Sequence, residues 1–290
     1  MEIKDILAKV RKIEIRTKGL TNNVFSGQYH SAFKGIGMSF SEVRNYRYGD
    51  EVRYIDWNVT AKTNEPHIKV FDEERDLTVM LLIDISNSLN FGSKNKVKKE
   101  LAAEISAVVS FSAIANNDKV GAILFSDKIE KYIPPKKGKK HILRIIREII
   151  YLEPENTKTD IGNALRYLSN VHNKRSIVFL ISDFISDDYS IPLKLARKKH
   201  DIVAINIFDK IEREIPNVGL LKVVDSETGR IIEIDTSDKL FLGKYIKYSK
   251  DKKIQNDDIL RKNQIDKIDI ELNEDYVASL YSFFKKRTSN

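Results

Sequence analysis

The stretch Leu77-Thr-Val-Met-Leu-Leu-Ile-Asp-Ile-Ser-Asn-Ser88 decides the fold of this chain. From Leu77 to Ile83 it is almost wholly apolar and rich in strand-forming residues, which is typical of a strand buried on both faces of a parallel sheet. Polar residues begin abruptly at Asp84, and hydroxyl groups follow at Ser86 and Ser88. Open α/β sheets place their ligand sites just past the carboxyl ends of such strands. Three hard oxygen donors on one turn would suit Mg²⁺ or Mn²⁺.

A second strand of the same kind strengthens this interpretation. Asp and Ser are also common helix caps and turn residues, so the first motif alone is only suggestive. The apolar run from Ser176 to Ser182 also ends in a carboxylate, Asp183. Between the two strands lies a polar loop, residues 156–160, in which Thr157 or Thr159 could present a hydroxyl group. The repetition favours an oxygen-rich site shared by two strand ends.

From residue 76 onward, strand and helix patterns alternate, which predicts an α/β fold with a mainly parallel sheet flanked by helices. The glycine-containing stretch 225–229 between two short apolar runs predicts a β-hairpin, which we interpret as a peripheral insertion over about 212–237. A long polar helix is expected at 238–263, and the alternating residues 265–272 predict an edge strand. We therefore assign 76–290 to one main domain.

The first 75 residues form a separate N-terminal part. Apolar residues recur among charges over residues 1–24, which predicts one amphipathic helix. Residues 27–75 combine aromatic residues with many arginines and acids, so we expect an extended but folded arm. We predict that its charges lock the arm against the main domain, with Trp57 in the core, although docking of a partner is the alternative. The charges concerned are Arg44, Arg47, Asp50, Arg53 and Asp56.

Composition excludes several classes of function. The chain is 41% hydrophobic and 32% charged, an ordinary balance for a globular protein. It has no cysteine, which excludes disulfides, thiolate zinc sites and cysteine nucleophiles, and its five histidines lack the spacing of a zinc helix. We find no signal-peptide pattern and no apolar run of the roughly 20 residues that span a bilayer. A cytoplasmic location is the default expectation.

The net charge of +8 raises nucleic acid as a partner. However, basic and acidic residues are interleaved almost everywhere, as in Lys98-Lys-Glu100, which predicts solvated faces. The basic stretch 134–141 contains no aromatic residue for base stacking, so we interpret it as a solvated loop. Gly35-Ile-Gly37 lacks the third glycine and the Gly-Lys-Ser/Thr of phosphate loops. We therefore expect no nucleic-acid partner.

Taken together, the motifs resemble a known family. Asp84-x-Ser86-x-Ser88, Thr159 and Asp183 resemble, in order and placement, the metal-ion-dependent adhesion site of von Willebrand factor A-like domains. Upstream stretches resemble the signature of the MoxR-associated bacterial family with such a domain, known as domain of unknown function fifty-eight. These stretches are Phe33-Lys-Gly-Ile-Gly37, Arg47-Tyr-Gly-Asp50, Arg53-Tyr-Ile-Asp-Trp57, Lys62-Thr63 and Glu73-Glu-Arg75.

This resemblance implies a Rossmann-like sheet of six strands with the metal at its carboxyl edge. The roles carried over are direct or water-mediated binding by Asp84, Ser86 and Ser88, binding by Thr159 in one liganded state, and binding through water by Asp183. Lys158 stands where a small residue often precedes the threonine, so Thr157 competes with Thr159 for this role. In such sites, a Glu or Asp carboxylate of a partner typically fills the open coordination position.

The resemblance further implies a non-enzymatic, metal-dependent protein-interaction module. It would act as an adaptor or co-chaperone with a MoxR-type AAA+ ATPase and an unknown client protein. The chain has no Walker motif, so any ATP hydrolysis belongs to the partner. The alternative is a Mg²⁺-dependent hydrolase, either a phosphatase or a nuclease. Against it, Asp84-Ile-Ser86 lacks the second carboxylate of an Asp-x-Asp phosphatase loop.

Overall fold

A computed structural model gives the structure of most of the chain. It describes residues 12–13, 23–33, 38–73, 77–93, 96–154, 158–224 and 231–288. The helices are α2 (Asn23–Ala32), α3 (Trp57–Thr63), α4 (Lys98–Ala115), α5 (Lys139–Tyr151), α6 (Ile161–Val171), α7 (Ser190–Arg197), α8 (Lys239–Lys262) and α9 (Tyr276–Thr288). Three short 3₁₀ turns are η1 (Val52–Tyr54), η2 (Asn87–Asn90) and η3 (Lys210–Glu212). The strands are β1 (Met38–Asn45), β2 (His67–Glu73), β3 (Thr78–Asp84), β4 (Lys119–Phe125), β5 (Ile129–Lys136), β6 (Ile177–Ser182), β7 (Asp201–Phe208), β8 (Leu220–Val224), β9 (Ile231–Asp235) and β10 (Asp266–Glu271).

The main domain is built on one central sheet. Within the described residues, its strand order is β10-β7-β6-β3-β4-β5. Neighbouring strands are parallel except β5, which runs antiparallel to β4. The opening strand β3 lies between β6 and β4, and it is buried from Val79 to Asp84. The mainly parallel sheet predicted from the alternating pattern is confirmed, with β10 at one edge and β5 at the other.

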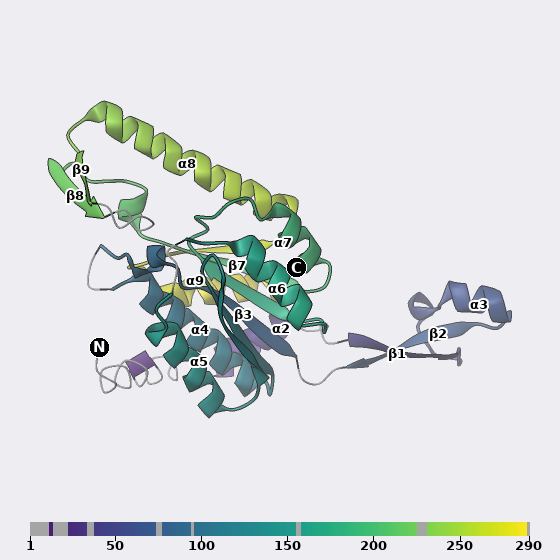
Figure 1. Ribbon diagram of the computed structural model, residues 1–290. Helices are drawn as coiled ribbons and strands as arrows, with labels where there is room; N and C mark the ends of the chain where they lie inside the picture. The colour runs from purple at the N-terminus through teal and green to yellow at the C-terminus, as the bar shows by residue number, and fades with distance from the viewer. Residues whose placement is uncertain are drawn as a thin grey trace.

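Helices cover both faces of this sheet, which explains why its strands are apolar on both sides (Figure 1). Successive strand residues point to opposite faces. On one face, Leu81 and Ile83 belong to a core that includes side chains of α4, α5 and α9. On the other face, Met80 and Leu82 pack with side chains of α6 and α7 and with Leu260 of α8. The fold is thus the three-layer α/β arrangement expected for a von Willebrand A-like domain.

The carboxyl edge of the sheet collects acidic residues. Because β3, β6 and β7 run parallel, their carboxyl ends meet at one edge. Asp84 ends β3, Asp183 follows β6 and Asp209 follows β7. Two of these three carboxylates are the ones predicted from the sequence. This edge is where the candidate site lies.

The N-terminal arm consists of β1, β2, η1 and α3, and β1 pairs antiparallel with β2. In Figure 1 it extends away from the central sheet. Trp57 is 67% exposed, so the prediction that it belongs to the core is wrong. The physical reason is that the arm has no second layer: among its described side chains, Ile68 is the one buried hydrophobic residue.

Charged groups shape the arm from within. Arg44 donates two hydrogen bonds to the carboxylate of Asp50, at 2.8 and 2.9 Å. Asp50 also accepts from the backbone amide of Arg47 at 2.7 Å. Asp56 caps α3 by accepting from the amides of Asn58 and Val59. The sequence predicts that these charges fasten the arm to the main domain, whereas in the structure these bonds join residues of the arm to one another.

Two peripheral elements follow the predicted plan. Strands β8 and β9 form an antiparallel pair separate from the central sheet, and α8 matches the long polar helix. The hairpin turn, residues 225–230, lies outside the described residues, as does Gly35-Ile-Gly37. The predicted helix over 1–24 also lies largely outside them, but Ile13 packs in the core. In the part of the chain that the structure describes, no helix combines the length and apolarity needed to cross a membrane.

Candidate metal-binding site

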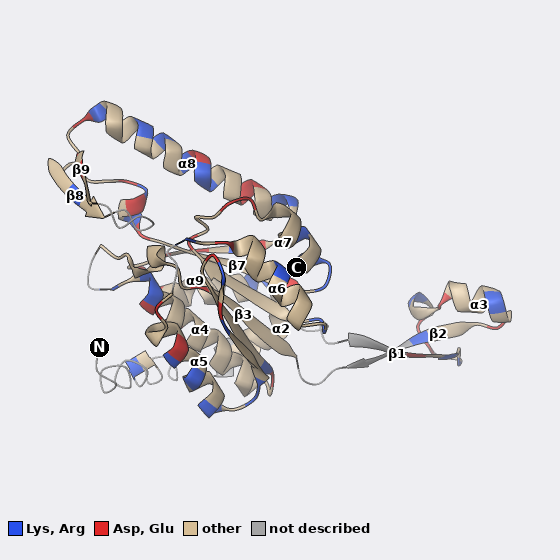
Figure 2. Ribbon diagram, viewed as in Figure 1, with Lys and Arg blue, Asp and Glu red and all other residues tan. Residues whose placement is uncertain are grey.

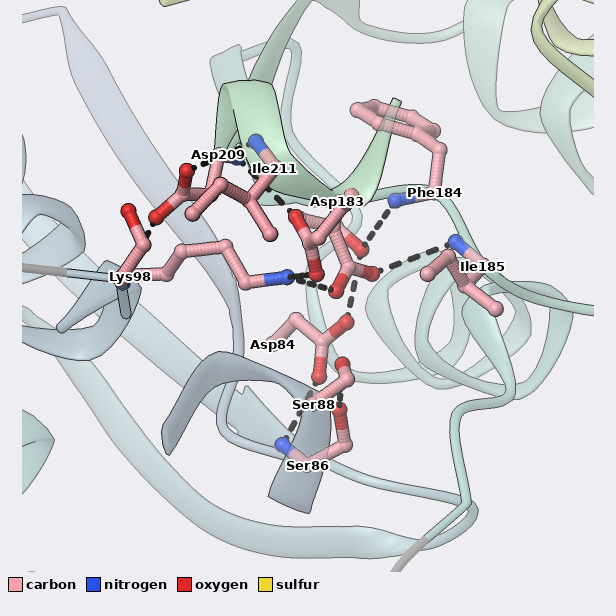
Figure 3. Close-up of polar contacts among 12 residues, drawn as sticks. Asp84, Ser86, Ser88, Lys98, Asp183, Phe184, Ile185, Asp209 and Ile211 are labelled. Atoms are coloured by element: carbon pink, nitrogen blue, oxygen red, sulfur yellow. Dashed lines mark hydrogen bonds and ion pairs between the residues drawn. The ribbon is translucent and has the colours of Figure 1, made fainter. Parts of the chain in front are cut away.

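A tight turn after β3 brings the first motif together (Figure 3). Asp84 is fully buried, and its Oδ1 accepts a hydrogen bond of 2.8 Å from the backbone amide of Ser86. This bond turns the chain sharply, because the amide two residues later must point back at the carboxylate. The hydroxyl oxygens of Ser86 and Ser88 lie 3.1 Å apart. The structure therefore places the three predicted oxygen donors on one turn.

Strand β6 supplies a second contact to the same carboxylate. Ser182 donates its hydroxyl proton to Oδ2 of Asp84 at 2.7 Å and accepts from the amide of Phe184 at 3.0 Å. Burial raises the pKa of Asp84 to about 7, and the negative charge of Asp183 adds to that rise despite the bonds from Ser182 and Ser86. An ionised Asp84 is therefore costly unless a cation lies nearby.

The second predicted carboxylate, Asp183, is paired with a buried lysine. The ammonium of Lys98 lies 2.9 Å from Oδ2 of Asp183 and 2.6 Å from Oε1 of Glu212. Burial alone lowers the pKa of Lys98, but the charges of Asp183 and Glu212 outweigh it, so the pKa is raised. Asp183 Oδ1 accepts from the amide of Ile185 at 3.2 Å. Lys98 thus stays charged and holds the end of β6 to η3.

The third predicted element, the threonine loop, lies next to the cluster. Thr159 borders a cavity that Asp183 also lines. The carbonyl oxygen of Thr159 accepts a hydrogen bond of 3.2 Å from the hydroxyl of Ser186. Thr157 lies outside the described residues. The structure therefore places Thr159 at the cavity, but it shows no bond from its hydroxyl to the Asp84 turn.

The donor set fits a small divalent cation. Adjacent ligands of an octahedral Mg²⁺ shell, each about 2.1 Å from the ion, are about 3 Å apart, close to the 3.1 Å between Ser86 Oγ and Ser88 Oγ. Asp84 is a buried carboxylate for which the described residues provide no ion pair, so a cation would compensate its charge. No group of three or more His, Cys, Asp or Glu side chains in the described residues could hold a metal. The candidate site therefore depends on its hydroxyl groups.

The cavity beside this cluster has a volume of about 390 Å³. Its walls come from the loops before α6 and after β6, the end of β7, η3, β10 and the inner side of α8. Tyr245 of α8 donates its hydroxyl proton to the carbonyl of Glu212 at 2.8 Å, which fastens the helix to η3. The bond from Asn256 to the carbonyl of Phe184, 2.9 Å, fastens it to the loop after β6. These two bonds hold α8 above the sheet edge.

Sequence reasoning missed two residues of the site. The prediction that Lys98-Lys-Glu100 forms a solvated face is wrong for Lys98 and Lys99, which are both buried. The helical pattern alone gave no sign that distant carboxylates would surround Lys98. Glu212 could have been noticed in the sequence, because Asp209-Lys-Ile-Glu212 has the spacing of a capping box. The structure contains this capping box at the start of η3.

The chain matches a known protein family over most of its length. The family model described as "Protein of unknown function DUF58" matches residues 42–255, and the chain belongs to this family. An uncharacterised protein of Mycobacterium tuberculosis is 29% identical to it over 231 residues, which are 79% of this chain and 73% of that protein. The matched residues include the Asp84-x-Ser86-x-Ser88 turn and Asp183.

Solved structures also align with the chain. An aerotolerance-related membrane protein from Bacteroides fragilis aligns with a TM-score of 0.49 and 16% identity, over 73% of this chain and 98% of that one. Proximal thread matrix protein 1 from the mussel byssus, described as having a zinc-occupied MIDAS motif, aligns with a TM-score of 0.37 and 18% identity. That alignment covers 46% of this chain and 38% of the mussel protein. Scores at this level carry no functional conclusion.

Proposed function

We propose that this protein is a non-enzymatic interaction module that binds a partner protein through a divalent cation, Mg²⁺ or Mn²⁺. The observation that carries the proposal is the buried Asp84, which lies beside two hydroxyl groups and lacks an ion pair among the described residues. Asp84, Ser86 and Ser88 would hold the ion, with Asp183 and Thr159 at its margin. When bound, the ion would supply positive charge for a carboxylate of the partner.

The residues around the ion have positioning roles. Ser182 and the amide of Ser86 each donate to one oxygen of Asp84, which fixes the plane of the carboxylate. The ammonium of Lys98 forms an ion pair with one carboxylate oxygen of Asp183 and so holds that side chain in place. Side chains that are held this way lose little freedom when a ligand binds, and such preorganisation increases affinity.

Binding explains the cluster better than hydrolysis. A hydrolase needs a nucleophile or an activated water together with an acid or base in hydrogen-bond reach. The described contacts of Asp84 are made with Ser86 and Ser182, and no histidine takes part in them. The position that supplies a second carboxylate in Asp-x-Asp phosphatases is held by Ser86.

The partner that we propose is a MoxR-type AAA+ ATPase, with this chain as its adaptor or co-chaperone. Two observations support this choice. First, the chain belongs to the DUF58 family, and stretches of its sequence resemble the signature of MoxR-associated proteins. Second, its sequence has no Walker motif. ATP-driven work would therefore be done by the partner.

A capture experiment tests this function. Tagged wild type and Asp84→Asn, both verified as folded by circular dichroism, would capture proteins from a native lysate of the source organism, with Mg²⁺ or with EDTA. We expect an AAA+ ATPase with the wild type in Mg²⁺ only. Because the ATPase itself needs Mg²⁺, the decisive comparison is between the wild type and Asp84→Asn, both in Mg²⁺. Equal recovery of the ATPase by both baits would exclude the site from recruitment.

A further inference from the structure

We infer that the cavity under α8 binds an extended, acidic segment of the partner protein. This inference rests on the proposed function, in which one partner carboxylate approaches the cation beside Asp183. It goes further by assigning the neighbouring residues of the same segment to the cavity. The geometry, the charge and the shape of the cavity each support it.

The geometry is favourable because the cavity begins where the candidate metal cluster ends. Asp183 and Thr159 line it, and so does Glu212 of η3. Asp183 thus belongs both to the cluster and to the cavity wall, so a chain segment that binds beside Asp183 has room for its next residues in the cavity. At about 390 Å³ the cavity lies within the range of roughly 300–1,000 Å³ found for ligand pockets.

The charge of the walls selects an anionic ligand. Five cationic side chains line the cavity: Lys158, Arg213, Lys252, Lys253 and Lys267. Two of its acids, Asp183 and Glu212, are already paired with Lys98. Among the cations, Lys267 pairs with Asp257 and Asp269. The guanidinium of Arg213 lies over the ring of Phe208.

Three lysines remain available to a ligand. Lys158, Lys252 and Lys253 are exposed, and in the described part of the chain none of them forms an ion pair or a hydrogen bond. Exposed Asp187 is the acid on the cavity wall that could oppose them. The rim of the cavity therefore carries more positive than negative charge, and carboxylates of a ligand would complement it.

The shape favours a chain over a compact ion. The lining residues of α8 run from Tyr245 to Leu260 at helical spacing, which is about 22 Å along the helix axis. Figure 1 shows α8 running across this side of the molecule, and Figure 2 shows basic residues along it. The tyrosines Tyr245 and Tyr248 on the same wall offer apolar contact between the charges. A long wall with spaced lysines fits an extended polypeptide with several acidic residues.

Charge reversal on α8 tests the assignment with a matched control. The probe is a fluorescein-labelled hexaglutamate peptide, and the readout is fluorescence anisotropy in Mg²⁺. Lys252→Glu/Lys253→Glu changes the cavity wall. Lys247→Glu/Lys250→Glu changes the net charge of the same helix equally, at exposed residues that do not line the cavity. All four lysines are exposed, so we expect both variants to fold.

The expected result is a loss of peptide affinity of about tenfold or more in the cavity variant and a much smaller loss in the control. Equal losses in both variants, or no binding of the peptide to the wild type, would overturn the inference. So would displacement of the peptide by inorganic sulfate at lower concentration than by unlabelled hexaglutamate. The rise in Tm caused by Mg²⁺ is measured in parallel, and its absence from the wild type would instead reject the proposed function.

Discussion

At the scale of single residues, Lys98 is the side chain that neutralises the acidic groups around Asp183 in the candidate site. It lies fully buried between Asp183 and Glu212, which approach it from the end of β6 and from η3. Removing one member of a buried ion pair leaves the other charge without compensation. Lys98 therefore serves two roles: it joins two segments that are distant in sequence, and it lowers the attraction of Asp183 for any other cation.

Replacing this lysine tests both roles. We expect Lys98→Met to lose about 3 kcal/mol of unfolding free energy in EDTA, because two carboxylates lose their counterion. We also expect Mg²⁺ to raise its Tm more than that of the wild type, because the competing ammonium is gone. The measurement is urea unfolding followed by circular dichroism, with a Mg²⁺ series by thermal unfolding.

The neighbouring Lys99 provides the control. It is also buried, but its ammonium donates to the carbonyl of Leu152 at 2.7 Å rather than to a carboxylate. Lys99→Met should therefore lose less stability and show the Mg²⁺ response of the wild type. If the two variants were equally stable, the ion-pair role of Lys98 would be refuted.

At the scale of elements, the arm formed by β1, β2 and α3 is held together by polar bonds. Arg44 bonds both carboxylate oxygens of Asp50, and these bonds lower the pKa of that carboxyl. A pair of strands alone is marginally stable in water. The arm should therefore open independently of the main domain.

Limited proteolysis tests this independence. We expect Arg44→Met to be cut faster than the wild type within residues 38–73, because the turn at Asp50 loses its bidentate partner. The Tm of the main domain should not change. Lys62→Met, at an exposed position of α3, is the control and should be cut at the wild-type rate. A fall in Tm for Arg44→Met would show that the arm and the domain unfold together.

The sequence was most informative about elements with a strong apolar pattern. The run Leu77–Ile83 predicted a central strand because a strand that is buried on both faces is apolar at nearly every position, without alternating polar residues. The position of Asp84 and Asp183 at the carboxyl edge of the sheet was predictable because polarity begins where their strands end. The position of Trp57 was not predictable, because a tryptophan indicates burial only where a second layer exists to cover it. The same holds for Lys98, whose partners come from segments 85 and 114 residues away.

At the scale of the whole molecule, a buried histidine links stability to pH. His200 is buried, its Nδ1 lies 2.9 Å from the hydroxyl of Ser176, and its ring stacks on His172. Burial, followed by the charges of His172 and Lys199, lowers the pKa of His200 to about 4. The folded protein thus keeps His200 neutral at a pH where the unfolded chain, with a histidine pKa of about 6.5, takes up a proton.

The sign of the effect follows from this difference. Protons bind the unfolded state more tightly, so stability is present above pH 6.5 and is lost as the pH falls toward about 4. From pH 7 to pH 5, His200 should account for a loss of about 2 kcal/mol. Urea unfolding of the wild type and His200→Asn at both pH values measures it. The same pH dependence in both proteins would show that His200 is not responsible.

The central claim is that the Asp84 turn binds a divalent cation, and isothermal titration of Mg²⁺ tests it most directly. Three folded proteins would be compared: the wild type, Asp84→Asn, and Asp251→Asn, which removes an exposed acid of α8. We predict saturable binding at one site in the wild type and in Asp251→Asn, and a loss of affinity of about tenfold or more in Asp84→Asn, because an amide replaces the charged ligand. The absence of saturable binding in the wild type, or equal affinity in Asp84→Asn, would contradict the account.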